Sequence, residues 1–155
     1  MEDQRPKTWE HINEVHKLIN KVIMELQDRA VKHDQSKLET PERQIFDEYT
    51  PKLRNVEYDS VEYKDCLKEM KVALNHHYTN NRHHPEYFKN TYIDNKWDPL
   101  SGMNLIDIIE MFCDWKAATL RHEDGDIELS IDINKKKFNV SNQLTNIFQN
   151  TVDLL

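Results

Sequence analysis

The chain has 155 residues, 37% of them hydrophobic and 32% charged, and a net charge of -7. Such a chain is long enough to bury a core without disulfides, and its composition argues against intrinsic disorder. No stretch approaches the ~20 apolar residues of a membrane span, and the acidic balance disfavours polymeric nucleic acid as a partner.

Three helices are predicted in the first half of the chain. Apolar residues recur at three- and four-residue spacing over residues 9–28, with Thr8 as N-cap. A second helix should begin at Thr40-Pro41 and end near residues 50–51, because the residue before a proline avoids the helical region. Ser60 caps a third helix. Its shared face is formed by Tyr63, Leu67, Met70, Leu74 and His77.

The middle of the chain is predicted to have less regular structure. Residues 78–101 contain two prolines and are predicted to be irregular or short-helical. A strongly apolar helix then opens at Asn104 or at Asp107 and continues to about Leu120. We treat Cys113, within this helix, as a core residue, because no base that would activate a catalytic thiol can be placed beside it.

The C-terminal segment allows two interpretations. Residues 124–126 should form a turn. The apolar alternation after it resembles a strand, but a single strand needs a partner, so a helix over residues 126–137 is preferred. Ser141 caps the last helix. With no repeat and no linker, the prediction is an all-α fold with a single domain over residues 1–155.

Histidines are the most unusual feature of the composition, since there are eight and most are clustered. His33-Asp34 places an imidazole beside a carboxylate, and both are good ligands for divalent cations. Residues 75–86 add two histidine pairs, an arginine and a glutamate. On the first helix His11 and His16 compete for an inward position, and periodicity does not choose between them. Each feature by itself also fits a solvated loop or a core histidine.

An acidic stripe marks the apolar helix. Asp107, Glu110 and Asp114 are three and four residues apart, so they share one face. Buried carboxylates repel one another unless a cation lies among them, and a divalent metal would meet that need. The alternative is a set of basic partners: Lys37, Arg82 and Arg121.

The order of these motifs resembles the HD-domain superfamily of metal-dependent phosphohydrolases. Residues 33–37, His-Asp-Gln-Ser-Lys, look like its His-Asp-x-Gly-Lys signature, with Ser36 where glycine is common. Residues 113–118 are similar to the segment around its final metal-binding aspartate. The whole chain also resembles a small family found in phage and bacterial genomes, which shares the segments at residues 33–34, 82–86 and 110–115.

The resemblance implies an HD-like helical bundle and a set of metal ligands. His11, with His16 as its alternative, would be the first ligand, and His33 and Asp34 the central pair. Asp114, with Asp107 as its alternative, would close the site. The remaining implied ligands, which suit a second metal, are His77, His84 and Glu110.

The function implied is hydrolysis of a phosphate ester on a small nucleotide or related molecule. A divalent metal (Mn, Fe, Ni, Co, Zn or Mg) would activate a water molecule at Asp34. Lys37, Arg82 or a lysine of residues 135–137, otherwise a solvated helix face, would neutralise the phosphate oxygens.

Two other classes of function stay open. One is a non-catalytic protein that binds a nucleotide signal or a host protein, and the other is a purely structural bundle. The oligomeric state, with a homodimer among the options, is also open. The charged N-terminus and the two isolated cysteines favour the cytoplasm, which would be that of a bacterial host if the chain is phage-encoded.

Overall fold

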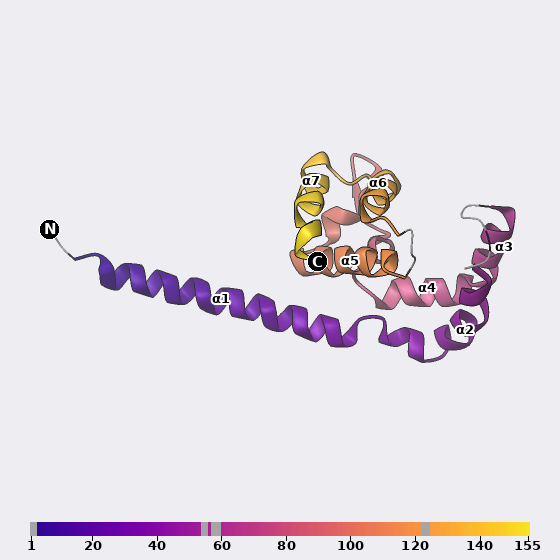
Figure 1. Ribbon diagram of the computed structural model, residues 1–155, viewed down its shortest axis with the longest axis horizontal. Helices are drawn as coiled ribbons and strands as arrows, with labels where there is room; N and C mark the ends of the chain where they lie inside the picture. Colours follow the sequence, from indigo (N-terminus) through magenta and orange to yellow (C-terminus); the bar gives the residue numbers. More distant parts are fainter. Residues whose placement is uncertain (1–2, 54–55, 57–59, 122–124) are drawn as a thin grey trace. The chain divides into compact units, whose positions relative to one another are not determined.

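The computed structural model describes residues 3–53, 56, 60–121 and 125–155. The chain divides into two units, residues 1–33 and residues 34–155, and each is described by itself. The described residues form seven α-helices, four short 3-10 helices and one two-stranded hairpin (Figure 1). The predicted all-α class is therefore confirmed. Among the described helices, none has the length and apolar character needed to cross a membrane.

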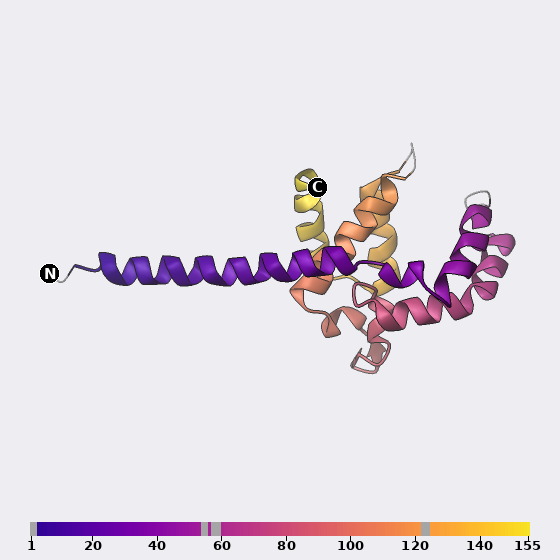
Figure 2. The ribbon, with the colours of Figure 1, turned by 90° about the horizontal axis from the view of Figure 1, so that it is seen from below.

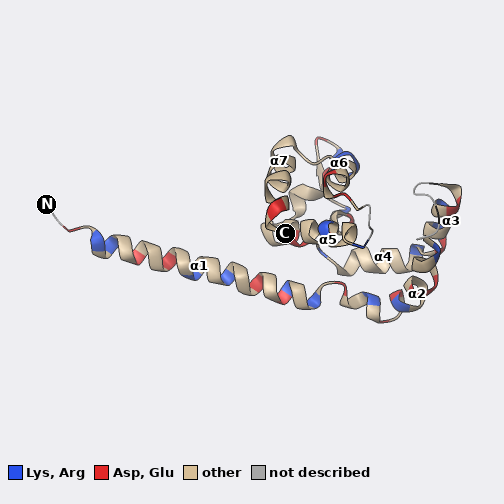
Figure 3. Ribbon diagram, in the orientation of Figure 1, with Lys and Arg blue, Asp and Glu red and all other residues tan. Residues whose placement is uncertain are grey.

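The first unit consists essentially of one helix, α1 (Arg5–Lys32). The predicted helix is confirmed but extends further at both ends. Thr8 is not the N-cap, because its hydroxyl lies in the first turn and donates to the Gln4 carbonyl at 3.1 Å. Pro6 fits this turn, where its missing N–H has no helical partner to lose. Lysine and arginine alternate with acidic residues along α1 (Figure 3).

The second unit begins with a 3-10 helix, Gln35–Leu38, followed by α2 (Glu42–Leu53). The start of α2 matches the prediction, but the predicted end near residues 50–51 is wrong, since Pro51 lies within the helix. A proline this close to the C-terminus disturbs only the last turn, so the helix continues to Leu53.

The predicted third helix is two helices, α3 (Val61–Glu69) and α4 (Lys71–Asn80). Ser60 caps α3 as predicted, accepting from the Tyr63 N–H at 3.1 Å. The break falls at Met70, which has φ -77° and ψ -3° and is 2% exposed. No proline or glycine stands nearby in the sequence, so the break does not come from a local helix breaker.

Residues 81–104 connect α4 to α5. They contain 3-10 helices at Pro85–Phe88 and Pro99–Gly102, as the irregular interpretation predicted. They also form a hairpin, β1 (Tyr92–Ile93) and β2 (Lys96–Trp97), that was not predicted. Its two turn residues both have positive φ, 48° and 60°, which is typical of a two-residue hairpin turn. Strands of two residues are too short to show alternation.

Three capped helices complete the unit: α5 (Leu105–Thr119), α6 (Ile127–Phe138) and α7 (Asn142–Thr151). Asn104, not Asp107, is the N-cap of α5. Asp126 caps α6 through the amides of its first turn, so the helical interpretation is confirmed over the strand. Ser141 caps α7 as predicted. The predicted turn at 124–126 lies partly outside the described residues.

The hydrophobic core lies among α5, α6 and α7, with α6 packed against both of its neighbours (Figures 1 and 2). The Phe112 and Phe148 rings stack with centroids 4.7 Å apart. The other buried members of this cluster are Met111, Trp115, Ile127, Ile131, Phe138 and Val140. Cys113 is exposed, so the expectation that it is a core residue is wrong. One residue corresponds to 100° on a helix, which turns Cys113 away from Phe112.

Candidate metal centre

Four side chains from separate parts of the second unit meet at one point. Asp34 comes from the turn before the first 3-10 helix, His77 from α4, and His83 and His84 from the loop after α4. Each offers one ligand atom, and these four atoms lie within 4.8 Å of one another. Asp34, His77 and His84 were predicted ligands, whereas His83 was not.

The contacts within this cluster are direct. Asp34 Oδ1 lies 3.3 Å from His77 Nε2 and 3.5 Å from His83 Nε2. The Nε2 atoms of His77 and His84 are 2.8 Å apart. Both His77 and His83 are 2% exposed. A hydrogen bond between two imidazoles uses one proton, whereas a cation would satisfy the lone pairs of all the nitrogens and the carboxylate together.

Asp34 reaches the cluster from a left-handed turn, with φ 56° and ψ 13°. Aspartate and asparagine tolerate this conformation better than most side chains. The ammonium of Lys37 lies 2.6 Å from Asp34 Oδ2, which leaves Oδ1 directed at the imidazoles. Lys37 also lies over the Phe46 ring, 5.4 Å from its centroid. The ammonium group of Lys37 is thus held at the edge of the cluster.

The loop after α4 holds His83 in a turn and His84 in an extended conformation. His84 has φ -88° and ψ 127°, because the residue before Pro85 is kept out of the helical region. Burial, assisted by the neighbouring His83 and His77, lowers the pKa of His84 to about 3. The imidazole of His84 therefore stays neutral near neutral pH, which is the form that coordinates metals.

Arg82, in the same loop, is paired with the first carboxylate of the α5 stripe. Its Nε and Nη2 donate to Asp107 Oδ1 and Oδ2 at 3.2 and 2.8 Å. Asp107 is fully buried and also accepts from the Asn104 N–H. These bonds tie the loop to the start of α5. Asp107 is thus occupied by Arg82 and the N-cap, and the choice between Asp114 and Asp107 as closing ligand stays a prediction.

The next two carboxylates of α5 face the two histidines that follow Arg82. Glu110 Oε1 lies 3.1 Å from His83 Nδ1. The charge of Asp114 acts on His84, and Asp114 offers a carboxylate oxygen within 4.8 Å of one from Asp34. Arg82, one of the basic partners anticipated as the alternative to a metal, thus pairs with the first carboxylate, while the second lies against the imidazole of His83, whose Nε2 lies toward Asp34.

Glu42 was not predicted from the sequence as a site residue, but it contacts two of the histidines. It is fully buried in the first turn of α2. Its Oε2 lies 2.8 Å from His77 Nδ1, and its Oε1 lies 2.6 Å from His76 Nδ1. A signal was present, since Glu42 shares the three- and four-residue spacing of the apolar residues Ile45 and Phe46 and so lies on the inward face of α2.

Three predicted residues belong to the first unit. His11 and His16 both lie on α1 and are exposed, and His16 Nε2 is 3.3 Å from the Asn20 amide nitrogen. His33 ends α1 and directly precedes Asp34. The ligand roles of His11 and His33 stay predictions.

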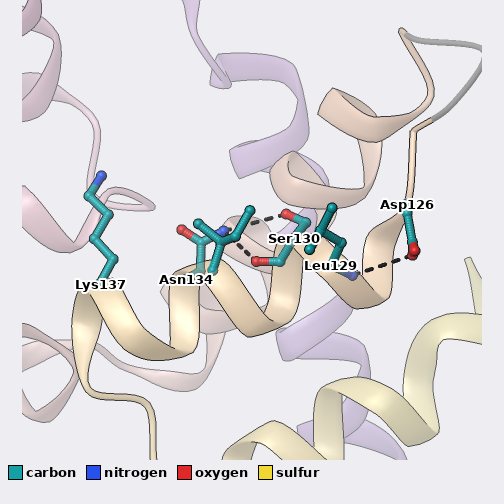
Figure 4. A pocket seen from close by; sticks show the side chains of 6 residues that line it. Asp126, Leu129, Ser130, Asn134 and Lys137 are labelled. Atoms are coloured by element: carbon teal, nitrogen blue, oxygen red, sulfur yellow. Dashed lines mark hydrogen bonds between the residues drawn. The ribbon is translucent and has the colours of Figure 1, made fainter. Parts of the chain in front are cut away.

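A surface hollow of about 280 Å³ lies along α6, apart from the histidine cluster (Figure 4). All its lining residues belong to α6 or cap it: Asp126, Leu129, Ser130, Ile133, Asn134 and Lys137. Lys137 pairs with Glu86 at 3.0 Å with more than half of its side chain exposed, in keeping with a solvated helix face. The hollow carries no group of reactive side chains comparable with the cluster.

The fold is all-α, and the cluster brings three imidazoles and a carboxylate close enough together that they could hold a metal ion. The chain belongs to the family of unknown function DUF5662, whose model matches residues 1–154. No curated protein and no solved structure matches the chain. The resemblance to HD-domain proteins stays a prediction.

Proposed function

We propose that this protein is a metal-dependent phosphohydrolase that acts on a small nucleotide or related phosphate ester. The observation that carries the proposal is the convergence of Asp34 with His77, His83 and His84. Asp34 lies far in the sequence from α4 and the loop after it, which carry the three histidines, and a site of this kind costs stability unless it binds something. The choice of phosphate ester as substrate rests on the resemblance described above.

The donor set fits a transition metal. Imidazole nitrogens suit Mn, Fe, Co, Ni and Zn, whereas Mg prefers oxygen ligands and keeps several waters. Three imidazoles to one carboxylate therefore favour the first group of ions. Asp114 supplies a further carboxylate beside Asp34, and His33, as the peptide neighbour of Asp34, keeps its predicted role.

The residues around the cluster would have separate roles in the hydrolysis. When bound, the metal supplies the means to lower the pKa of a water molecule to near neutrality. Asp34 and the three histidines hold that metal, and Glu110 faces His83 from α5. Lys37 places its ammonium at the edge of the cluster, where it can neutralise a phosphate oxygen. Arg82 is paired with Asp107 at the start of α5, whereas Lys37 is paired with Asp34 of the cluster itself, so Lys37 lies closer to the proposed metal ligands.

The test compares Asp34→Asn with Asp47→Asn. Asparagine keeps the left-handed turn at position 34 but removes the charge, and Asp47 is an exposed aspartate on α2. We expect wild type and Asp47→Asn to bind a transition metal at neutral pH and to release phosphate from nucleotides. Asp34→Asn should lose activity by about 100-fold or more, because a metal ligand is removed.

Metal content is measured by elemental analysis of purified protein, and activity by a phosphate-release screen with Mn²⁺ present. Wild type without metal, or Asp34→Asn with wild-type activity, would overturn the proposal. A nucleotide bound in stoichiometric amount and recovered intact would favour the binding function instead.

A further inference from the structure

We propose that Glu42 is a positioning residue of this site, which holds His77 in the tautomer that carries its proton on Nδ1. The Nε2 atom of His77 is then left with a lone pair for a metal. The inference rests on the proposed metal site, but the tautomer of His77 is a property of the metal-free protein.

The contacts around His77 Nδ1 determine whether His77 or Glu42 donates the hydrogen bond between them. Glu42 Oε2 is the nearest polar atom, at 2.8 Å, and an ionised carboxylate can only accept. Asn81 Nδ2 lies 3.0 Å from the same nitrogen, but its two hydrogens point to Ser36 Oγ and to the His77 carbonyl, both at 2.8 Å. Ser36 Oγ also lies 3.3 Å from His77 Nδ1, but its single hydroxyl hydrogen is donated to the closer Glu42 Oε2, at 3.1 Å. The proton between His77 and Glu42 therefore belongs to His77.

Glu42 is itself held in place. His76 Nδ1 lies 2.6 Å from its other oxygen, Oε1, and an ionised carboxylate oxygen can only accept, so His76 is the donor. Together with Ser36 and His77, this gives the buried carboxylate three donors from two separate elements. The side chain of His76 is 41% exposed, so the first histidine of this pair supports the carboxylate while the second faces the cluster.

The consequence appears on the far side of the His77 ring. Its Nε2 lies 3.3 Å from Asp34 Oδ1 and 2.8 Å from His84 Nε2. A carboxylate behind a metal-bound imidazole fixes the ring and raises its basicity, and loss of such a partner typically costs about 10–100-fold in metal affinity. Glu42 has the position and the contacts for this role toward His77.

The first measurement uses metal-free protein. Long-range ¹H–¹⁵N correlation spectra of the imidazoles distinguish the two tautomers, and we expect His77 to be the Nδ1–H form in wild type. In Glu42→Leu this preference should be lost. A wild-type His77 with its proton on Nε2 would overturn the proposal, whether or not the protein binds metal.

The second measurement is metal affinity, by competition with a chromophoric chelator for Co²⁺. Glu42→Leu should weaken binding by about 10–100-fold, whereas Glu48→Leu, the same change at an exposed position of α2, should not. Glu42→Gln keeps one carbonyl oxygen that can accept from His77, so it should recover much of the loss. Circular dichroism verifies that each variant is folded.

Two results would contradict the positioning role. One is wild-type Co²⁺ affinity in folded Glu42→Leu. The other is Glu42→Gln with the tautomer of wild type but the affinity of Glu42→Leu. If Glu42→Leu fails to fold, the proposal is still tested by the tautomer of His77 in wild type and by the tautomer and Co²⁺ affinity of Glu42→Gln. Wild type that binds no metal but shows the expected tautomer would refute the proposed function and leave the placement of His77 standing.

Discussion

Tyr78 shows how the packing around the histidines changes the chemistry of a single residue. It follows His77 on α4, and its ring lies 5.1 Å from the His84 ring, centroid to centroid. Burial, with a further contribution from the charge of Glu86, raises the pKa of Tyr78 to about 12 from its ordinary value of 10.0. The phenol therefore resists ionisation in the folded protein.

The raised pKa of Tyr78 predicts that the folded protein loses stability at alkaline pH. Below pH 10.0 the phenol of Tyr78 is neutral in both the folded and the unfolded chain, so nothing is lost. Between 10.0 and about 12 the unfolded chain releases the proton first, and the free energy of unfolding falls as the pH rises. Tyrosinate absorbance of metal-free protein should show one late-ionising group that Tyr78→Phe removes.

Tyr92→Phe is the control, because Tyr92 is 60% exposed. It should leave the late component of the absorbance unchanged. A Tyr78→Phe titration curve that keeps this component would show that another tyrosine is responsible.

At the scale of elements, α5 organises the loop that carries the histidines. Its three carboxylates are three and four residues apart, and they face Arg82, His83 and His84 in chain order. The spacing that gives a helix one face thus matches three consecutive residues of the loop after α4. The N-cap of α5 belongs to the same arrangement, since Asp107 both closes the capping box and pairs with Arg82.

The two roles of Asp107 can be separated by mutation. Asn104→Ala removes the cap and should lower the free energy of unfolding by about 1 kcal/mol. Asp107→Ala removes part of the cap and also the partner of Arg82, so a larger loss of about 2–4 kcal/mol is expected. Urea denaturation followed by circular dichroism measures both. Equal losses would mean that the Arg82 pair contributes nothing to stability.

At the scale of the whole molecule, a metal held by the cluster would join the beginning of the second unit to α4 and the loop after it. A ligand that binds only the folded chain raises its stability, by about 2.7 kcal/mol when its concentration is a hundred times Kd. We therefore expect Mn²⁺ or Zn²⁺ to raise the Tm of wild type and a chelator to reverse the effect. Calorimetry checks this.

Asp34→Asn should abolish most of this response, while Asp47→Asn should keep it. A Tm that is insensitive to both metal and chelator would instead support the purely structural role, in which the histidines serve only as partners of buried carboxylates.

Much of the secondary structure and part of the site could be predicted from the sequence. Helix periodicity and N-caps such as Ser60 and Ser141 depend on residues close together in the sequence, so they can be recognised without tertiary information. Asp34, His77 and His84 were singled out in the same way, because a histidine–aspartate pair and paired histidines are typical metal ligands, and the structure brings these three together. Of the basic partners predicted for the acidic stripe of α5, Arg82 is found on Asp107, whereas the histidine facing Glu110 was not predicted.

Tertiary structure decided what depends on distant partners. The break at Met70 has no local cause, and the exposure of Cys113 depends on which face of α5 meets the core. Glu42 resembles any glutamate in a first helical turn until α4 brings two histidines onto it. His83 likewise became a ligand candidate when its loop was tied to α5. Local sequence determines the conformation of a segment, whereas the meeting of side chains depends on packing between segments far apart in the chain, and that information is absent from any short stretch of residues.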